Sequence, residues 1–514
     1  MAKSYRLVDR DQQFLLPTDM GQWLAADHFV WFLIDVIDAL DMKVFEAAGR
    51  RGGVGRQAYD PRLLLALLVY GYATGQRSSR RIEDLCHTDV AYRVLCAQDV
   101  PDHSTIARFR QTHHDAVADL FVQVLVVAGK AGLGRVGIVA IDGTKIAANA
   151  SVGANRKQSW LRREVDQMMA EADTADAADD VLFGESRGNE LAAGWADRAT
   201  RKERIKAALA AAEGAAAKAA APDAARAKRH GAKVEAAKGH LEAERAKAQK
   251  RFDVFGAKKE CADREGTPKP TGVYPESAED YRSVDAAKKR LQGTQKRRDE
   301  AAAKAATRAG ERKDPRANTT DPDSGPMPTA KGWIQGYNAQ LAVSDDQLIL
   351  AAQATDTPVD CGQLTPMIEA AQTGIDALNS GRDAADHTQI GIVVADAGYL
   401  SEENLASGGP DRLIATGKRY ELEKAAQHPG HQPDAEPDSA GPSNLIEAMA
   451  KRLRTEKAMN TYRRRGITVE PVNGHLKDRI GLRQFSRRGI KGVQAELVLA
   501  ATVVNLLKIY RHGS

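Results

Sequence analysis

Three carboxylates stand where they could do chemistry together. Asp142 ends the apolar run 135–142, Asp396 ends a second run, 390–396, and Glu470 lies in a stretch rich in arginine. In sheets flanked by helices, side chains beyond strand ends face a cleft, where ligands collect. Carboxylates that converge there repel each other unless a cation joins them. Because the chain has 69 acidic residues, the alternative is that two such aspartates are incidental.

The chemistry expected of such a site is phosphoryl transfer. Two divalent ions about 3.5–4 Å apart, bridged by carboxylates, are its usual device, and magnesium suits oxygen ligands. If the residues from Glu470 onward are helical, Asn473 and Lys477 share its face. A metal ligand beside a phosphate-binding lysine suits DNA cleavage, whereas the alternative role of Glu470 is a salt bridge. Pro471 predicts that a helix begins or is kinked there.

The elements that must position these residues follow from apolar patterning. The two runs ending in aspartate lack alternation, which is typical of strands buried on both faces. Further strands are expected at 336–343 and 348–354, joined as a hairpin by a short polar turn. Helices are expected at 363–378, 445–465 and 492–510, the last as a buried helix.

Residues 1–130 are predicted to be helical. Apolar spacing marks 29–40, Pro61 can open a second helix, and short helices follow at 79–85 and 90–95. The segment 101–110 places Pro and Asp ahead of a helix that carries Arg108 and Arg110, as in a helix-turn-helix unit. Plain helical packing is the alternative interpretation.

Residues 151–330 differ in composition. Between residues 201 and 250, 20 of 50 residues are Ala, and most others are Lys, Arg or Glu, which favours helix. Large apolar side chains are too sparse for a sustained heptad seam. Gly214, Pro222, Gly231 and Gly239 predict a helix broken into pieces. We expect an inserted helical arm with little core, followed by a loop over 310–330.

Composition excludes several classes. Of 514 residues, 43% are hydrophobic and 28% charged, and no apolar run reaches the roughly 18 residues that span a bilayer. The first residues lack the apolar stretch of a secretory signal, and four scattered cysteines predict neither a disulfide framework nor a cysteine zinc site. We therefore expect a cytosolic, multidomain protein.

Positive charge is concentrated near the C-terminal end. Residues 451–511 hold 15 basic and 4 acidic residues, a net of +11, so the remainder of this +5 chain carries −6. Such a segment suits nucleic acid, because neutralising phosphates releases counterions. A solvated basic helix face is the alternative.

Four motifs in order now carry a resemblance. They are Ile141-Asp142-Gly143-Thr144, Gly336-Tyr337-Asn338-Ala339-Gln340, Ala395-Asp396-Ala397-Gly398-Tyr399 and Val469-Glu470-Pro471-Val472 with Lys477. The chain resembles bacterial insertion-sequence transposases of the DDE class, in the branch with an N-terminal helical domain and a long charged insertion. The similarity extends over nearly the whole chain.

The resemblance implies an α/β fold with an RNase H-like mixed sheet flanked by helices. The catalytic domain would comprise 131–150 and 331–514, interrupted by the insertion 151–330, and residues 1–130 would form an all-α DNA-binding domain. Asp142, Asp396 and Glu470 would be the metal-binding catalytic triad for two Mg²⁺ ions, which Mn²⁺ could replace.

The family pattern also implies DNA contacts. Tyr462, Arg465 and Lys477 correspond to its Tyr, Arg and Lys, although four residues separate Arg465 from Glu470 where the family has three. Arg108 and Arg110 are the contacts expected from the N-terminal domain.

The implied activity is metal-dependent cleavage at terminal inverted repeats and strand transfer into target DNA. The partner would be double-stranded DNA, bound by a homodimer in the bacterial cytoplasm, at the nucleoid and not at a membrane. Two alternatives remain: a decayed, non-catalytic DNA-binding copy, and a nuclease of the same fold that cuts without joining.

Overall fold

The computed structural model describes residues 19–47, 58–167, 195–266, 268, 275–311, 314–417 and 445–513. The chain divides into two compact units, one formed by Met1–Ala154 with Thr320–Ser514 and the other by Asn155–Thr319. The second unit therefore begins four residues after the expected start of the insertion and ends before its expected end at 330.

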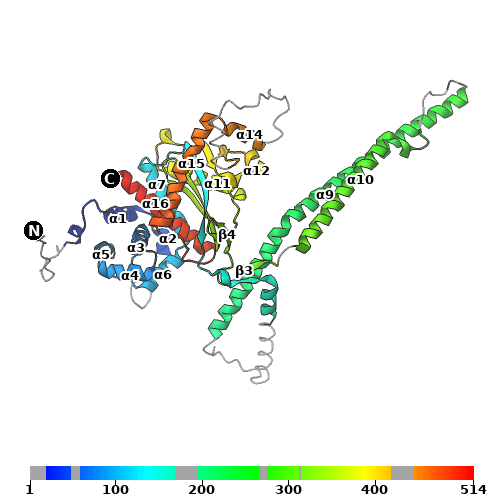
Figure 1. Cartoon of the computed structure of the whole chain (residues 1–514). Coiled ribbons are helices and arrows are strands. Elements are labelled where there is room, and N and C mark those ends of the chain that lie inside the picture. Colours follow the sequence, from blue (N-terminus) through cyan, green and yellow to red (C-terminus); the bar gives the residue numbers. More distant parts are fainter. Residues whose placement is uncertain are drawn as a thin grey trace, which may run out of the picture. The chain divides into compact units, whose positions relative to one another are not determined.

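A mixed sheet lies at the centre of the first unit (Figure 1). Its strands are β1 (Ile138–Ala147), β4 (Gly325–Thr329), β5 (Gly332–Ser344), β6 (Ile349–Thr355), β7 (Ile392–Ala395) and β8 (Asp411–Ile414). β1 pairs with β5 antiparallel and with β7 parallel, and β7 pairs with β8 parallel. The other edge of β5 pairs antiparallel with β4 and then with β6. The expected α/β class with a mixed sheet is thus confirmed, as is the β5–β6 hairpin.

Two predictions about strands were wrong. β1 does not end at Asp142 but continues to Ala147, because β5 pairs with it along its whole length, from Ser344 to Gly336. The expected loop 310–330 contains β4, which pairs with the first half of β5. The same range also contains β3 (Arg316–Asn318), in the second unit.

The expected N-terminal helices are present. They are α1 (Phe29–Ala39), α2 (Lys43–Ala47), α3 (Pro61–Ala73), α4 (Ser79–Thr88), α5 (Val90–Leu95), α6 (His103–Thr112) and α7 (Ala116–Lys130). Local chemistry explains two of the starts: Asp60 caps α3 ahead of Pro61, and Asp102 caps α6. Buried side chains of these helices belong to the same hydrophobic core as the central sheet.

The C-terminal helix α16 (Ile490–Gly513) is the buried helix that its apolar run predicts. Among the described helices, it alone is long and apolar enough to cross a membrane, yet 83% of its apolar window is buried inside the protein. Its residues pack against α3, α7 and β6, within the same core. Helix α11 (Leu364–Ser380) also packs on the sheet, where a helix was expected.

Helix α15 (Glu456–Gly474) follows α14 (Leu445–Leu453) and runs through Pro471 without beginning there. The expected helix 445–465 is therefore two helices, the second of which extends nine residues further. A proline lacks the amide that would bond the carbonyl one turn earlier, here Ile467. The side-chain amide of Gln347, in the β5–β6 turn, donates to that carbonyl at 2.8 Å. A tertiary contact thus satisfies the group that Pro471 leaves open.

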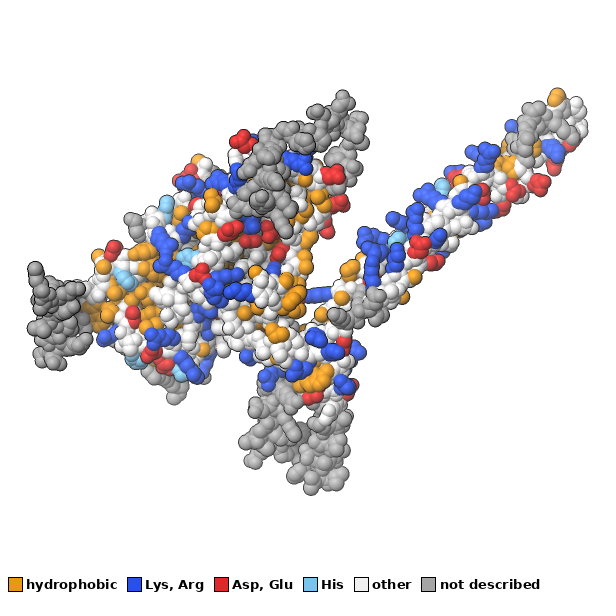
Figure 2. Space-filling model, viewed as in Figure 1, with side chains coloured by type: hydrophobic (Ala, Val, Ile, Leu, Met, Phe, Trp, Pro, Cys, Tyr) orange, Lys and Arg blue, Asp and Glu red, His pale blue; other side chains and the backbone are white. Residues whose placement is uncertain are grey.

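The second unit is a long helical arm. α9 (Trp195–Glu265) continues through Pro222 and all three glycines, so the predicted breaks were wrong. α10 (Arg282–Glu311) packs along it, and small apolar side chains join the two, including Leu241, Ala248, Val284 and Ala287. Figure 2 shows basic and acidic side chains interspersed along this arm. Strands β2 (Asn155–Lys157) and β3 pair antiparallel where the arm begins and ends.

A buried ion pair joins the two ends of the chain within the first unit. Arg77, just before α4, donates to the Glu496 carboxylate of α16 at 2.8 Å, and the Glu496 side chain is fully buried. Glu496 also accepts the backbone amides of Ser486 and Arg487 at 2.9 and 3.0 Å. Arg77 in turn donates to the carbonyl of Gly481 at 2.7 Å. These bonds compensate for the removal of both charges from water.

We expect Glu496→Gln to lower the free energy of unfolding by about 3 kcal/mol, because it leaves the Arg77 charge buried without its partner. Urea unfolding of the full-length protein measures this. Glu46→Gln is the matched control: Glu46 pairs with Arg62 at the surface, at 3.1 Å, and its loss should cost less than about 1 kcal/mol. Equal losses in the two variants would contradict the structural role of Glu496.

Candidate active site

Asp142 lies in the middle of β1, under the helix α15. Its Oδ2 accepts a hydrogen bond from the Asn473 side-chain amide at 3.1 Å and forms an ion pair with Arg465 at 3.5 Å. The two residues lie on one face of α15, two turns apart. The Asp142 side chain is only 15% exposed, so these contacts replace much of the water that a free carboxylate would hold. The helix therefore closes over the carboxylate.

Asp396 directly follows β7. The parallel register pairs Ile141 with Ala395, so the next residue on each strand, Asp142 and Asp396, stands side by side with the other. Asp396 accepts the backbone amide of Gly398 at 2.9 Å and caps the short 3-10 turn Ala397–Tyr399. The structure thus brings together the two strand aspartates predicted from the sequence.

Burial and crowding of charge alter the acidity of Asp142. Burial raises its pKa to about 6; Arg465 opposes this, while Asp396 and Asp360 add to it. Three carboxylates therefore influence one another here. A bound cation would reduce the repulsion that acts on Asp142.

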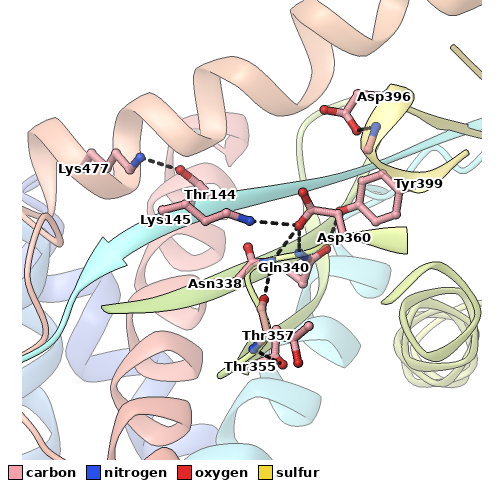
Figure 3. A network of polar contacts seen from close by, with 11 residues as sticks. Thr144, Lys145, Asn338, Gln340, Thr355, Thr357, Asp360, Asp396, Tyr399 and Lys477 are labelled. Carbon is pink, nitrogen blue, oxygen red and sulfur yellow. Dashed lines mark hydrogen bonds and ion pairs between the residues drawn. The ribbon is translucent and has the colours of Figure 1, made fainter. Parts of the chain in front are cut away.

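Asp360 is a member of this group that the sequence reasoning missed. Its Oδ1 accepts the side-chain amides of Asn338 at 2.6 Å and Gln340 at 2.8 Å, and the Lys145 ammonium at 3.1 Å (Figure 3). Its Oδ2 has no hydrogen-bond partner within the described ranges and lies toward Gly398: a Cβ there would be 3.3 Å from it and 3.0 Å from Asp396 Oδ1. Oδ1 of Asp360 thus accepts three hydrogen bonds, whereas its Oδ2 lies on the side of Asp396.

The Asp360 network extends to Tyr399 and requires Gly143. The Tyr399 hydroxyl bonds to Gln340 Oε1, and burial raises the pKa of Tyr399, so that it keeps its proton and donates. A Cβ at Gly143 would lie 2.6 Å from Asp360 Oδ1 and 2.4 Å from Gln340 Nε2. Gly143 is therefore a point of close approach within β1 and not the strand end predicted from it. The Asn338-x-Gln340 alternation on one strand face was the available signal for this network.

Glu470 does not join the two aspartates in this structure. It lies on the exposed side of α15, between the buried Val469 and Val472, and forms no hydrogen bond or ion pair with any described residue. Over the part of the chain that the structure describes, no three His, Cys, Asp or Glu side chains gather closely enough to hold a metal ion. The alternative of a salt bridge for Glu470 is not observed either.

The basic residues expected at the site are close to it. The Lys477 ammonium donates to the Thr144 hydroxyl, two residues beyond Asp142 on β1 (Figure 3). Burial lowers the pKa of Lys477, and Arg483 adds to this. Tyr462 is buried and bonds Arg465, whose pKa is raised because the effects of Asp142 and Tyr462 outweigh that of burial. Arg465 thus faces a carboxylate and not open solvent.

The two N-terminal arginines differ. Arg108 is exposed on α6, whereas Arg110 turns inward and donates to the carbonyl of Arg77 at 2.9 Å. The carbonyl of Arg110 accepts the guanidinium of Arg487 at 3.1 Å. Only Arg108 therefore presents its charge outward.

The donor set fits a hard divalent cation. Apart from the Arg465 guanidinium, the groups described around Asp142 and Asp396 are carboxylates and amides, and magnesium takes oxygen ligands. The side-chain oxygen of Asn473 is buried without a hydrogen-bond partner beside Asp142. Asp142 and Asp396 are the residues that would hold the ion, with the free oxygen of Asp360 nearby. Such an ion would offset the repulsion among these carboxylates.

Comparison with known proteins gives two family matches. Residues 18–112 match a transposase domain of the DUF772 family, and residues 439–510 match a transposase DDE domain. No curated protein and no solved structure matches the chain. The first match covers helices α1–α6, and the second covers α14, α15 and most of α16, including Glu470 and Lys477. The two matches, one toward each end of the chain, support its assignment to the insertion-sequence transposases of the DDE class.

Proposed function

We propose that this protein catalyses metal-dependent cleavage of DNA at terminal inverted repeats and strand transfer into target DNA. The observation that carries the proposal is the parallel register of β1 and β7, which sets Asp142 beside Asp396. Lys477, held at Thr144 on the same strand, lies where a DNA phosphate would approach those carboxylates. The two family matches favour the same activity.

An RNase H-like catalytic core is part of the proposal. The strand order β6-β5-β1-β7-β8, antiparallel across the first three strands and parallel across the last three, supports it. In this view the catalytic domain comprises the expected segments 131–150 and 331–514. The helices of residues 1–130 would bind DNA, with Arg108 as the outward contact.

Asp142, Asp396 and Glu470 are the proposed triad for Mg²⁺, with Mn²⁺ as a substitute. The bound ions would activate the attacking water or 3′-hydroxyl and stabilise the leaving oxygen. Because Glu470 is exposed here, the proposal requires its side chain to reorient toward Asp142. Glu470 lies one helical turn before Asn473, whose side chain already contacts that carboxylate. Arg465, which pairs with Asp142 here, would then be available to DNA phosphate.

Asp360 has a positioning role in this proposal. It fixes Lys145 and, through Gln340, the hydroxyl of Tyr399, three residues beyond Asp396. This keeps the strand end that carries Asp396 in place beside β1. We further propose a homodimer on DNA, since two element ends must be brought together, in the cytoplasm of a bacterium.

One observation favours a second function. Glu470 is exposed and Arg465 neutralises Asp142, as would suit a protein that binds DNA without cutting it. The cleavage assay below separates this reading, and that of a nuclease without joining activity, from the proposal.

We expect Asp142→Asn, Asp396→Asn and Glu470→Gln each to reduce nicking of inverted-repeat DNA by about 100-fold or more, because each removes a proposed metal ligand. DNA binding should persist in all three. The measurement is cleavage and joining of labelled element ends with Mg²⁺, alongside a gel-shift assay.

Glu456→Gln is the matched control, because Glu456 is another exposed glutamate of α15. It should cleave as the wild type does. Near-normal cleavage by Glu470→Gln would remove Glu470 from the triad. Binding without any cleavage by the wild type would favour the non-catalytic protein, and cleavage without joining would favour the nuclease.

The acidity of Asp142 predicts a pH dependence. With a pKa of about 6, raised chiefly by burial, Asp142 is protonated below that pH and charged above it. Since a proton and a cation compete for the same carboxylate, Mn²⁺ affinity should rise as the pH passes upward through about 6. The measurement is a Mn²⁺ titration monitored by electron paramagnetic resonance, carried out one pH unit below and one pH unit above this pKa.

Asp142→Asn should show weak Mn²⁺ binding and little of this pH dependence. If the wild type bound Mn²⁺ equally at both pH values, Asp142 would not be a ligand.

Lys477→Ala should weaken binding to all DNA sequences alike and reduce the salt dependence by about one phosphate contact. Filter binding at several salt concentrations gives the slope. Lys457→Ala, an exposed lysine earlier on α15, controls for the loss of one positive charge. An unchanged slope for Lys477→Ala would exclude the phosphate contact.

A further inference from the structure

A basic pocket lies on the side of α15 away from Asp142. Helical geometry turns Pro471 and His475 to the face opposite Asn473 and Lys477. The pocket has a volume of about 460 Å³, within the range of small-ligand sites. Its other walls come from α16, from the connection between α7 and β1, and from the β5–β6 turn.

Three basic side chains and one carboxylate, Asp346, line this pocket. Arg135, Lys508 and Arg511 line it, and none of their side chains forms a hydrogen bond or an ion pair with a described residue. His475 also lines it, and its Nε2 atom is buried without a hydrogen-bond partner. Three cations and an unsatisfied ring nitrogen therefore meet in one cavity.

The acidic group in the wall, Asp346, favours the charge of Lys508 but forms no ion pair with it. Asp346 accepts the backbone amides of Gly134 at 2.8 Å and Arg135 at 3.1 Å, and the Ser344 hydroxyl at 2.6 Å. Its oxygens are thus used in shaping the turn. Burial lowers the pKa of Lys508; Asp346 opposes this effect and Arg511 adds to it. Burial also lowers the pKa of His475, and Arg511 adds to that effect through repulsion between the two positive groups. An anion would relieve this repulsion.

We propose that this pocket binds a phosphoryl anion, either a phosphate of nucleic acid or a free phosphate compound, through Lys508, Arg511 and Arg135. Guanidinium and ammonium groups are the usual partners of phosphate oxygens, and Lys508 is half-buried in the pocket, whereas Arg135 and Arg511 lie at its exposed rim. The pocket is separate from the carboxylates and does not depend on the proposed function.

The test is isothermal titration of full-length protein with inorganic phosphate at constant ionic strength. The wild type should show saturable binding, and the double variant Lys508→Gln with Arg511→Gln should bind at least about tenfold more weakly, since two charge-assisted bonds are lost. The double variant Arg454→Gln with Lys457→Gln changes the charge equally at exposed positions and should bind as the wild type does.

A second arm identifies the source of the phosphate. If it is nucleic acid, saturating duplex DNA should abolish the phosphate titration, and the pocket variant should lose about two phosphate contacts from its salt slope. If it is a free compound, duplex DNA should leave the titration intact. Absence of saturable phosphate binding, or unchanged affinity in the pocket variant, would overturn the proposal. Arg135→Gln, a change in an exposed loop, gives the same test should the double variant fail to fold.

Discussion

The repulsion between two neighbouring aspartates, one of them largely buried, shapes the packing around the central sheet of the larger unit. The parallel pairing of β1 with β7 leaves Asp142 and Asp396 side by side, and the Asp142 side chain is only 15% exposed. Burying like charges together is costly unless partners or protons reduce the charge. Arg465 and Asn473 from α15 approach one aspartate, and a backbone amide caps the other. The packing of α15 on the sheet thus helps to stabilise the charge of Asp142.

Much of this arrangement could be predicted from the sequence. The run that ends at Asp396 marked both strand and carboxylate, because buried parallel strands lack alternation. The helix starts at Pro61 and after Asp102 could also be predicted, since the preferences for proline and aspartate at helix starts are local. The length of β1 was not, because Gly143 resembles a strand end when the side chains that crowd it lie more than 190 residues away.

Other features depend on tertiary contacts that leave no local pattern. Asp360 follows β6 in an irregular segment, and only the fold carries it to Asn338 and Gln340. The side of α15 on which Glu470 lies is set by the burial of Val469 and Val472, and Pro471 is accommodated because Gln347 reaches the helix from another element. In α9, glycine costs of about 1 kcal/mol and a proline cost of about 3 kcal/mol are absorbed by a long Ala-rich helix against which α10 packs.

The antiparallel ladder of β2 and β3 has a consequence for how such chains can diverge. Asn155 pairs with Asn318, so the two ends of the arm lie one strand spacing apart, about 5 Å. The β2–β3 pairing therefore fixes the distance between the two ends of the arm, whatever the number of residues between them. Lengthening, shortening or exchanging α9 and α10 would leave that spacing unchanged. The arm is consequently the part of the gene most open to insertion and deletion during evolution.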